Sequence, residues 1–322
     1  MKGRLVCISL ALVLGSPGVF SKQTWSQFIS SVKHQAYNQG IRRDVIEYAF
    51  ANVKKPNRRV LKLDRSQPER RLTYAKYKKT RASKYKIMIG RKKYHKYSFL
   101  LHEIGNHFDV DPCFIASLWG METSYGSFKG SFPVIQSLAT LAYDNRRGAF
   151  FRKELMVALH ILNEGHIDLP QFKGEWAGAS GHTQFLPSSW KNFAIDYDED
   201  GYKDIWNNLP DAFASIANYL KQSGWKNDTP LLAQVQLPSN FSQKFISLKK
   251  IKTVSQWENM GVRFLQNNNI PPNFTASIIH PYGGPAMMVF NNFRVLMRWN
   301  RSTYFAGTVT YLANSICRRP HQ

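Results

Sequence analysis

Acidic residues are scarce in this sequence. The 322 residues include 21 Asp and Glu against 44 Lys and Arg, which gives a formal net charge of +23 at pH 7. A charge of this size favours an anionic partner, and nucleic acid, an acidic membrane surface and an acidic cell-wall polymer all qualify. A solvated basic surface without a specific ligand has the same composition. The charge therefore restricts the kind of partner without choosing one.

Long hydrophobic runs are also scarce. Residues 5–14 form an apolar run that is too short for a permanent membrane-spanning helix, and no second run reaches the roughly 18 residues that one needs. Lys2 and Arg4 precede this run, and helix-breaking residues follow it at 15–18, as in a secretory signal. We therefore predict that residues 1–21 are a signal peptide. The protein is then periplasmic, with membrane association if the signal is retained, and a cytosolic nucleic-acid-binding protein would have no use for such a signal.

Cysteine is rare, with three residues in the chain. Cys7 lies inside the predicted signal, before any small-residue cleavage site, which argues against lipid attachment there. Signal cleavage would leave Cys113 and Cys317. An oxidising compartment would permit one disulfide between them, closing a very long loop. Two buried free thiols are the alternative.

Apolar residues recur at helical spacing over most of the chain, and no internal repeat is present. Helices are predicted within residues 22–53, 98–126, 134–164, 211–220 and 291–316, strand-like pieces at 231–237 and 278–282, and a further helix near 254–265. Pro112 suits the first turn of a helix and Asp111 can cap it, so a turn is predicted at 109–112. The predicted fold class is mainly α, with a small β-containing part (α+β).

Residues 54–97 form a strongly basic segment in which Tyr side chains are interleaved with Lys and Arg. Taken alone, this mixture suits a nucleic-acid or polyanion surface. Leu61, Leu72 and Ile87 supply apolar positions for burial, so we predict that the segment is ordered. A solvated helical face is the commoner explanation of such a pattern.

Glu122 stands in an otherwise apolar helix, one turn from Leu118 and Trp119. Burial among apolar groups disfavours the carboxylate and raises its pKa. A glycosidase acid needs this change to stay protonated near neutral pH and donate to the leaving oxygen. A surface or capping Glu is the alternative. The usual glycosidase scheme also needs a second carboxylate. Four acidic residues follow Glu122 closely enough in the sequence to be this second carboxylate, but the residues around them do not single one out. They are Asp144, Glu154, Glu164 and Glu175.

Residues 196–207 follow the spacing of a calcium-binding loop, with Gly201 at position 6. Asn207 replaces the usual bidentate Glu at position 12 and offers one neutral oxygen. A solvated acidic turn is the alternative, and a bound Ca2+ would have a structural role. The candidate metal ligands are Asp196, Asp198, Asp200, Tyr202 through its carbonyl, Asp204 and Asn207.

Together these segments resemble the B-type lytic murein transglycosylases (glycoside hydrolase family 103). The resemblance covers residues 25–316 and keeps the family order. The matching segments are 63–69 (LDRSQPE), 115–126 (IASLWGMETSYG), 176–190 (WAGASGHTQFLPSSW), 196–206, 218–220 followed by Gly224 and Trp225, 290–293 (FNNF) and 299–306 (WNRSTYFA). Any one of them alone is a weak signal, and their combination is highly specific.

The resemblance implies a lysozyme-like, mainly helical core, with an N-terminal helical domain and a small β-containing domain packed around it. It places the single catalytic Glu of the family on Glu122. This residue acts as acid on the glycosidic oxygen between MurNAc and GlcNAc and then as base on the muramyl C6 hydroxyl. That hydroxyl attacks C1 and leaves a 1,6-anhydro ring without consuming water. The substrate's own N-acetyl group stabilises the cationic centre, which explains the missing second carboxylate, and the chemistry requires no cofactor.

The resemblance also implies a sugar-binding groove, in which Gln184, Asn300 and Tyr304 match family positions. Tyr125 lies in the segment that carries Glu122 and is predicted to bind substrate as well. The acidic loop matches a calcium-loop segment seen in a member of the family.

Three further residues predicted to bind substrate depart from the family pattern. The family usually has Met where Ser180 stands, Gln or Tyr where His182 stands, and a small polar residue where Glu175 stands. The extra carboxylate of Glu175 is predicted to alter subsite preference or to add a weak second acid or base.

The resemblance and the composition together predict five segments. They are the signal (1–21), a basic N-terminal helical domain (22–100), a catalytic core (101–228), a small α/β subdomain (229–290) and a C-terminal helical segment returning to the core (291–322). Peptidoglycan glycan strands are the predicted partner of a monomeric enzyme, with cell-wall synthesis or envelope-assembly proteins as further partners and no nucleic acid. Stem-peptide carboxylates would attract the basic segment, and salt would weaken that attraction.

Two other functions remain open at this point. A hydrolytic muramidase would use water, with Glu175 or Asp144 as the second carboxylate, and would leave reducing ends. A non-catalytic cell-wall-binding protein would bind glycan strands without releasing products.

Overall fold

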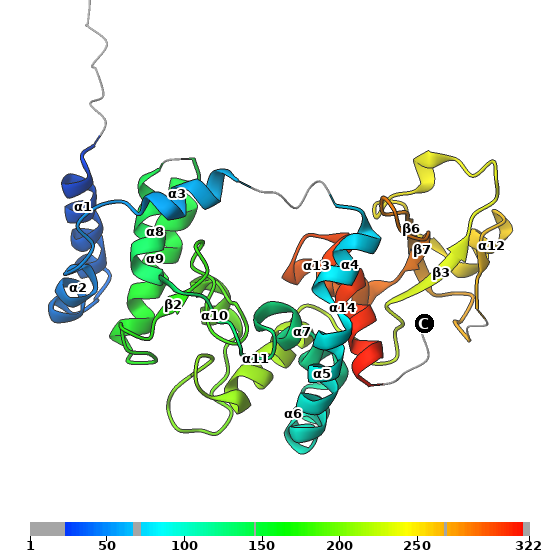
Figure 1. The fold of residues 1–322 in the computed structure, drawn as a ribbon, viewed down its shortest axis with the longest axis horizontal. Coiled ribbons are helices and arrows are strands. Elements are labelled where there is room, and N and C mark those ends of the chain that lie inside the picture. The colour runs from blue at the N-terminus through cyan, green and yellow to red at the C-terminus, as the bar shows by residue number, and fades with distance from the viewer. Residues whose placement is uncertain (1–22, 67–71, 145, 267–268, 318–322) are drawn as a thin grey trace, which may run out of the picture.

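The computed structural model describes residues 23–66, 72–144, 146–266 and 269–317. The predicted signal peptide lies outside these residues. Three hydrophobic cores organise the described chain, and Figure 1 shows the parts built on them arranged in a row. The mainly α (α+β) class predicted from the sequence is confirmed. No described helix is long and apolar enough to cross a membrane.

The first core is helical and joins two distant parts of the chain. Its helices are α1 (Trp25–Asn38), α2 (Arg43–Phe50), α3 (Arg58–Arg65), α8 (Val134–Tyr143), α9 (Gly148–Asn163) and α10 (Pro187–Phe193). A capping box fixes the start of α1, because the Thr24 hydroxyl accepts from the Gln27 amide while the Gln27 side chain accepts from the Thr24 amide. A small sheet pairs β1 (Phe132–Pro133) with β2 (Lys173–Gly174) beside α8.

The second core holds α4 (Tyr74–Arg81), α5 (Lys84–Lys96), α6 (Ser98–Phe108), α7 (Pro112–Thr123), α11 (Leu209–Gln222), α13 (Asn291–Trp299) and α14 (Thr303–Ile316). α7 is apolar and buried on almost every side, as expected of a helix that runs through a core. The predicted turn is confirmed, because Asp111 accepts from the Cys113 amide at 2.9 Å and Pro112 occupies the first turn. α13 and α14 are separate helices because the backbone is extended at Asn300.

A disulfide ties the start of α7 to the end of α14. Cys113 and Cys317 are bonded, with Cα atoms 6.2 Å apart and a sequence separation of 204. Of the two alternatives that the sequence leaves open, the structure has the disulfide.

The third core belongs to a five-stranded antiparallel sheet and α12 (Val254–Asn259). The strand order is β4-β6-β7-β3-β5. The strands are β3 (Leu232–Gln236), β4 (Lys252–Thr253), β5 (Arg263–Phe264), β6 (Thr275–Ile279) and β7 (Met287–Val289), and a 3-10 turn spans Gln243–Phe245. The helix predicted near 254–265 is too long. It ends at Asn259, because Gly261 adopts a φ of 86° and the chain continues into β5.

The cores divide the basic N-terminal part differently from the predicted segment 22–100. Helices α1–α3 belong to the first core, whereas α4 and α5 belong to the second. The physical reason is that each helix buries its apolar side against a distant partner: α3 against α8, and α5 against α7 and α14. The basic helix α5 is therefore brought directly against α7, and α4 against α14.

Candidate active site

Glu122 lies in the last turn of α7, where this helix leaves the second core. The residues before it, from Cys113 to Met121, are buried, whereas Glu122 is half-buried. The helix ends directly after it because Ser124 adopts a left-handed φ of 51°. One carboxylate is thus placed at the edge of an apolar core with partial access to solvent.

The indole of Trp299 holds this carboxylate. Its Nε1 donates to Glu122 Oε1 at 2.8 Å. Trp299 is the last residue of α13 and packs on Phe185 and Tyr219, with ring centroids 5.2 and 4.7 Å away. These rings fix the orientation of the indole and give the site an apolar wall.

Burial raises the pKa of Glu122 from 4.5 to about 7. The hydrogen bond from Trp299 and the charges of Arg81 and Lys86 lower the pKa, and the charge of Glu175 raises it, but burial is the largest effect. Both protonation states are therefore populated near neutral pH. A single residue with this pKa can donate a proton in one step and accept one in the next.

Lys86 brings positive charge from the basic helix α5 to this site. Its ammonium donates to the Gly120 carbonyl of α7 at 3.1 Å. Burial lowers the pKa of Lys86, the charge of Arg81 lowers it further, and the charge of Glu122 raises it. Lys86 and Arg81 thus favour the carboxylate form of Glu122, against the effect of burial.

Four acidic residues were considered as a second carboxylate. Among the described residues, Glu175 is the one of these four whose charge changes the pKa of Glu122. It follows β2 in a tight turn, where its amide donates to the Ala179 carbonyl at 2.7 Å. The other three are engaged elsewhere: Asp144 with Arg65, Glu154 with the Ser188 amide and Glu164 with His166. The structure therefore brings Glu175 toward Glu122 and leaves Asp144 in another place.

His182 supports α7 from the loop that contains Gly174, Gly178 and Gly181. Trp119 Nε1 donates to His182 Nδ1 at 3.0 Å. Burial lowers the pKa of His182 to about 4, and the charges of Lys129 and Lys93 act in the same direction. The ring is therefore neutral near pH 7 and accepts the indole proton. Its predicted substrate-binding role is limited by an exposure of 9%.

Ser180 and Tyr125 are buried in the structure, and their predicted part in substrate binding stays a prediction. Ser180 is 2% exposed, and its hydroxyl accepts from Trp206 Nε1 at 3.1 Å. Tyr125 is 4% exposed because its ring fills the space beside two glycines, where a Cβ at Gly90 or Gly120 would collide with it. Both residues support the site from inside the fold.

Gln184 and Asn300 each adjoin in sequence a residue of the apolar wall beside Glu122, Phe185 and Trp299 respectively. Gln184 has a φ of 50°, and its side-chain amide donates to the carbonyls of Lys129 and Gly181 at 3.2 and 3.0 Å. Asn300 is exposed and directly follows Trp299. Tyr304 opens α14, and its hydroxyl donates to the Tyr282 carbonyl at 3.2 Å. Their contacts with a sugar remain predictions.

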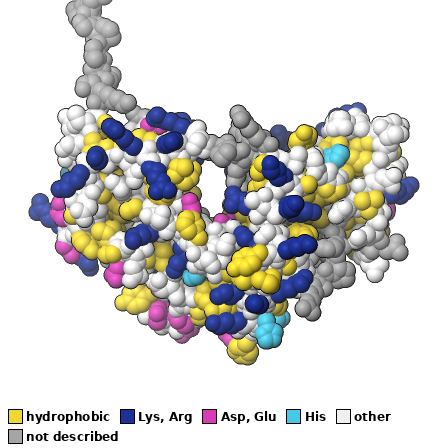
Figure 2. All heavy atoms as spheres, in the orientation of Figure 1, with side chains coloured by type: hydrophobic (Ala, Val, Ile, Leu, Met, Phe, Trp, Pro, Cys, Tyr) yellow, Lys and Arg dark blue, Asp and Glu magenta, His cyan; other side chains and the backbone are white. Residues whose placement is uncertain are grey.

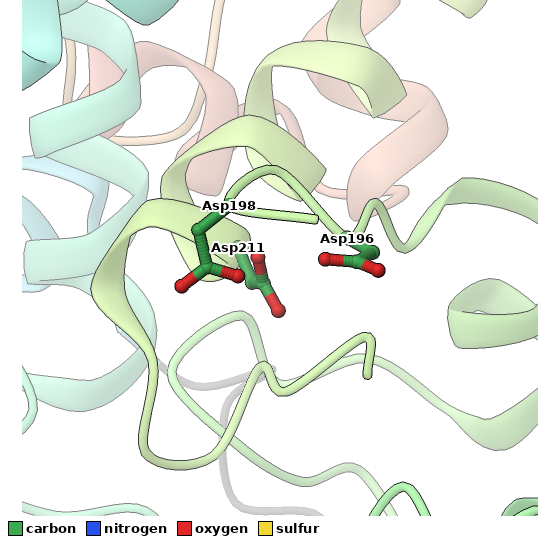
Figure 3. Close-up of side chains that lie close together, drawn as sticks. All are labelled: Asp196, Asp198 and Asp211. Atoms are coloured by element: carbon green, nitrogen blue, oxygen red, sulfur yellow. The ribbon is translucent and has the colours of Figure 1, made fainter. Parts of the chain in front are cut away.

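The acidic loop folds around a residue that lies outside the predicted set. Asp196, Asp198 and Asp211 present carboxylate oxygens within 4.8 Å of one another, and Figure 3 shows Asp211 between the other two. Asp211 lies in the first turn of α11 and is buried. Burial raises its pKa to about 6, and the charges of Asp198 and Asp196 raise it as well.

Asp204 is not among the carboxylates that converge here, and the predicted ligand roles of Asp204 and Asn207 stay predictions. Asp204 accepts from the Trp206 and Asn207 amides at 2.9 Å each. The Asn207 side chain donates to Gln171 and to Asp204. Asp200 instead closes the loop, because its carboxylate accepts from the Tyr202 amide at 2.8 Å. Asp211 thus brings a third carboxylate to Asp196 and Asp198 from outside the twelve-residue loop.

Residues 24–314 match the transglycosylase SLT domain family. The chain belongs to this family. It is 30% identical over 250 residues to membrane-bound lytic murein transglycosylase B of Escherichia coli (strain K12), covering 76% of this chain and 67% of the relative. The predicted B-type lytic transglycosylase identity is therefore confirmed.

Solved structures of such enzymes have the same fold. SltB3 of Pseudomonas aeruginosa, in complex with NAG-anhNAM-pentapeptide, superposes with a TM-score of 0.87 at 37% identity, covering 92% of this chain and 80% of that one. Slt35 of Escherichia coli, in complex with calcium, superposes with a TM-score of 0.79 at 25% identity, covering 91% and 93%. The lysozyme-like fold predicted for this lytic transglycosylase is confirmed.

Three residues of the site are absent from the sequence-based prediction. Trp299 lies in a matched segment, and its position beside Asn300 was the available signal. Lys86 is one cation among many in a basic segment, so nothing local distinguishes it. Asp211 stands four residues after the end of the twelve-residue loop. In the sequence it has the appearance of an ordinary acidic residue in the first turn of a helix.

Proposed function

We propose that this lytic transglycosylase cleaves the β-1,4 bond between MurNAc and GlcNAc in peptidoglycan and leaves a 1,6-anhydro-MurNAc end. The environment of Glu122 carries the proposal. It is one half-buried carboxyl group with a pKa of about 7, held by Trp299, and suited to act as acid and then as base. The ligand of SltB3 contains an anhydro sugar, which supports the same product here.

Each step moves one proton through Glu122. Protonated Glu122 donates to the glycosidic oxygen as the bond from C1 to that oxygen breaks. The carboxylate left behind is stabilised by the Trp299 hydrogen bond and by the charges of Lys86 and Arg81. It then takes the proton of the muramyl C6 hydroxyl while O6 bonds to C1. The enzyme returns to its starting protonation state, and no water is consumed.

A hydrolytic muramidase is the second candidate, because the charge of Glu175 acts on Glu122. In that mechanism Glu175 would activate water on the other side of the sugar. Digestion of purified peptidoglycan in water enriched in oxygen-18, followed by mass spectrometry, separates the two. Unlabelled anhydro ends are expected, and labelled reducing ends would overturn the proposal. Strand binding without any released product would indicate a wall-binding protein.

We also propose that the acidic loop holds a structural calcium ion. Asp196, Asp198 and Asp211 form a set of hard oxygen donors of the kind that Ca2+ prefers. Burial is the main reason that the pKa of Asp211 is raised, and the charges of Asp198 and Asp196 raise it further, so a cation beside these carboxylates would offset both effects. Slt35 of Escherichia coli was solved in complex with calcium, which supports the proposal. The ion would tie the loop to α11 and take no part in the reaction, for which we propose no cofactor.

The proposed location is the periplasm, reached through the signal predicted at residues 1–21. A relative that acts as a membrane-bound murein transglycosylase in Escherichia coli supports a place in the cell envelope. Glycan strands are the proposed partner. A monomeric state, contacts with cell-wall synthesis or envelope-assembly proteins, and the lack of a nucleic-acid partner remain predictions.

A further inference from the structure

The outward side of α5 combines positive charge with large exposed apolar side chains. Between residues 72 and 102 the sequence has ten Lys and Arg and no Asp or Glu. Tyr85, Met88 and Phe99 are nevertheless 70%, 44% and 82% exposed in this segment. We call the surface formed by these three residues with Lys84, Lys92 and Lys96 the α5 face.

Helical geometry places these residues together. Tyr85, Met88, Lys92 and Lys96 are three or four positions apart in α5, so they lie on one side of the helix. Phe99 is exposed in the first turn of α6, which begins two residues after α5 ends. Figure 2 shows hydrophobic side chains surrounded by Lys and Arg over α5 and α6.

The α5 face points away from the packed side of the helix. On that side Gly90 lies against Tyr125 and Ile316, where an added Cβ would come within 2.9 Å of each. Lys86 also reaches α7 from α5, at the Gly120 carbonyl. α5 therefore separates the α5 face from the surroundings of Glu122, and a partner on this face leaves the acid accessible.

A cavity adjoins the α5 face at the N-terminal end of α5. Its volume is about 330 Å³, and Lys78, Lys79 and Lys84 line it together with apolar surface from Ile87 and Tyr311. The Lys78 ammonium lies 4.8 Å from the centre of the Tyr311 ring. Such a cavity suits a group that carries a phosphate next to an apolar portion, as a phospholipid headgroup does.

We propose that the α5 face and this lysine-lined cavity form a contact surface for an anionic phospholipid bilayer. Charge complementarity accounts for the lysines, because each Lys or Arg near an acidic bilayer strengthens binding about fivefold. The apolar side chains favour a bilayer over a soluble polyanion. Tyr, Met and Phe gain by entering the boundary between headgroups and acyl chains, whereas an acidic polymer in water offers them no such environment.

The test is co-sedimentation of the full chain with vesicles of phosphatidylcholine alone or with about 30% phosphatidylglycerol, which gives the bilayer a negative surface potential. The apolar variant is Tyr85→Ser/Met88→Ser/Phe99→Ser. Its matched control replaces three apolar residues exposed elsewhere: Tyr37→Ser/Tyr48→Ser/Ile251→Ser, with exposures of 62%, 58% and 57%. All chains keep the same N-terminal segment, so differences between them report the α5 face.

A charge variant and its control complete the design. The variant is Lys84→Gln/Lys92→Gln/Lys96→Gln. The control removes three exposed lysines from other surfaces: Lys54→Gln/Lys249→Gln/Lys250→Gln. Release of muropeptides from peptidoglycan in the absence of lipid verifies that each variant is folded, since none of these residues belongs to the active site.

The expected result is binding to the anionic vesicles that weakens about tenfold in the apolar variant and about a hundredfold in the charge variant. Both controls should bind like the wild type. Equal wild-type binding to neutral and anionic vesicles would overturn the proposal. Unchanged binding by the apolar variant would also overturn it, and would identify a general polyanion surface for an acidic wall polymer or nucleic acid.

Discussion

Replacement of Trp299 by Phe removes one hydrogen bond from the Glu122 carboxylate and keeps the aromatic wall. The lost bond is Nε1 to Glu122 Oε1 at 2.8 Å, and a Phe ring still packs on Phe185 and Tyr219. A hydrogen bond to a charged group is worth about 1.5–3 kcal/mol. Because this bond favours the carboxylate, its loss raises the pKa of Glu122, by about one unit or more at 1.36 kcal/mol per unit.

The pH dependence of muropeptide release measures this change. In the proposed mechanism Glu122 starts the reaction protonated, so the rate should fall as pH rises through its pKa, which is about 7 in the wild type. In Trp299→Phe this alkaline limb should move to higher pH by about one unit, while the maximal rate falls about tenfold because the carboxylate formed in the reaction is less stabilised.

A matched control is Trp225→Phe, which loses an indole hydrogen bond to Asn227 at 3.0 Å away from Glu122. The rate of muropeptide release by Trp225→Phe should fall over the same alkaline pH range as that of the wild type. An alkaline limb that stays in place in Trp299→Phe, or moves to lower pH, would refute the role that we assign to the indole.

Three further predictions concern stability. Calcium at a hundred times its Kd should stabilise the protein by about 2.7 kcal/mol in thermal unfolding, and Asp196→Asn/Asp198→Asn should abolish the effect while leaving the calcium-free protein folded. Because the pKa of His182 is lower in the folded than in the unfolded protein, the unfolded protein binds a proton at this residue at a higher pH than the folded protein does. Stability should therefore fall as pH drops from about 6.5 toward 4, and His182→Gln should flatten this fall in urea titrations. Reduction of the bond between Cys113 and Cys317 should cost about 2–5 kcal/mol, and a reduced protein of unchanged melting temperature would contradict this.

Local patterns were sufficient to predict most of the helices and the apolar surroundings of Glu122. The apolar run around Glu122 specifies a buried helix, and Pro112 after Asp111 specifies its start. Both features depend on residues within a few positions of one another, so the sequence displays them directly. The type of reaction was predicted from the family motifs, because the matching segments occur in this chain in the same order as in the family.

Contacts between distant segments were not predictable in this way. Trp299 reaches Glu122 across 177 residues, and Asp211 completes an acidic cluster from the next helix. The same limit explains the division of the basic N-terminal part between two cores, since helix partners such as α3 with α8 are set by tertiary packing. Tyr125 and Ser180 are buried for the same reason, although their sequence positions adjoin the site.

The central claim is that Glu122 alone performs both proton transfers, and the products of Glu122→Gln and Glu175→Gln test it most directly. Mass spectrometry of muropeptides released from purified peptidoglycan should show anhydro ends from the wild type. Glu122→Gln should lose at least a hundredfold in rate, since general acid–base catalysis contributes about 10²–10⁴-fold. Glu175→Gln should keep the anhydro product, with Glu122 titrating at a lower pH because a charge that raises its pKa is gone. Anhydro products from Glu122→Gln at the wild-type rate, or their loss in Glu175→Gln, would contradict the account.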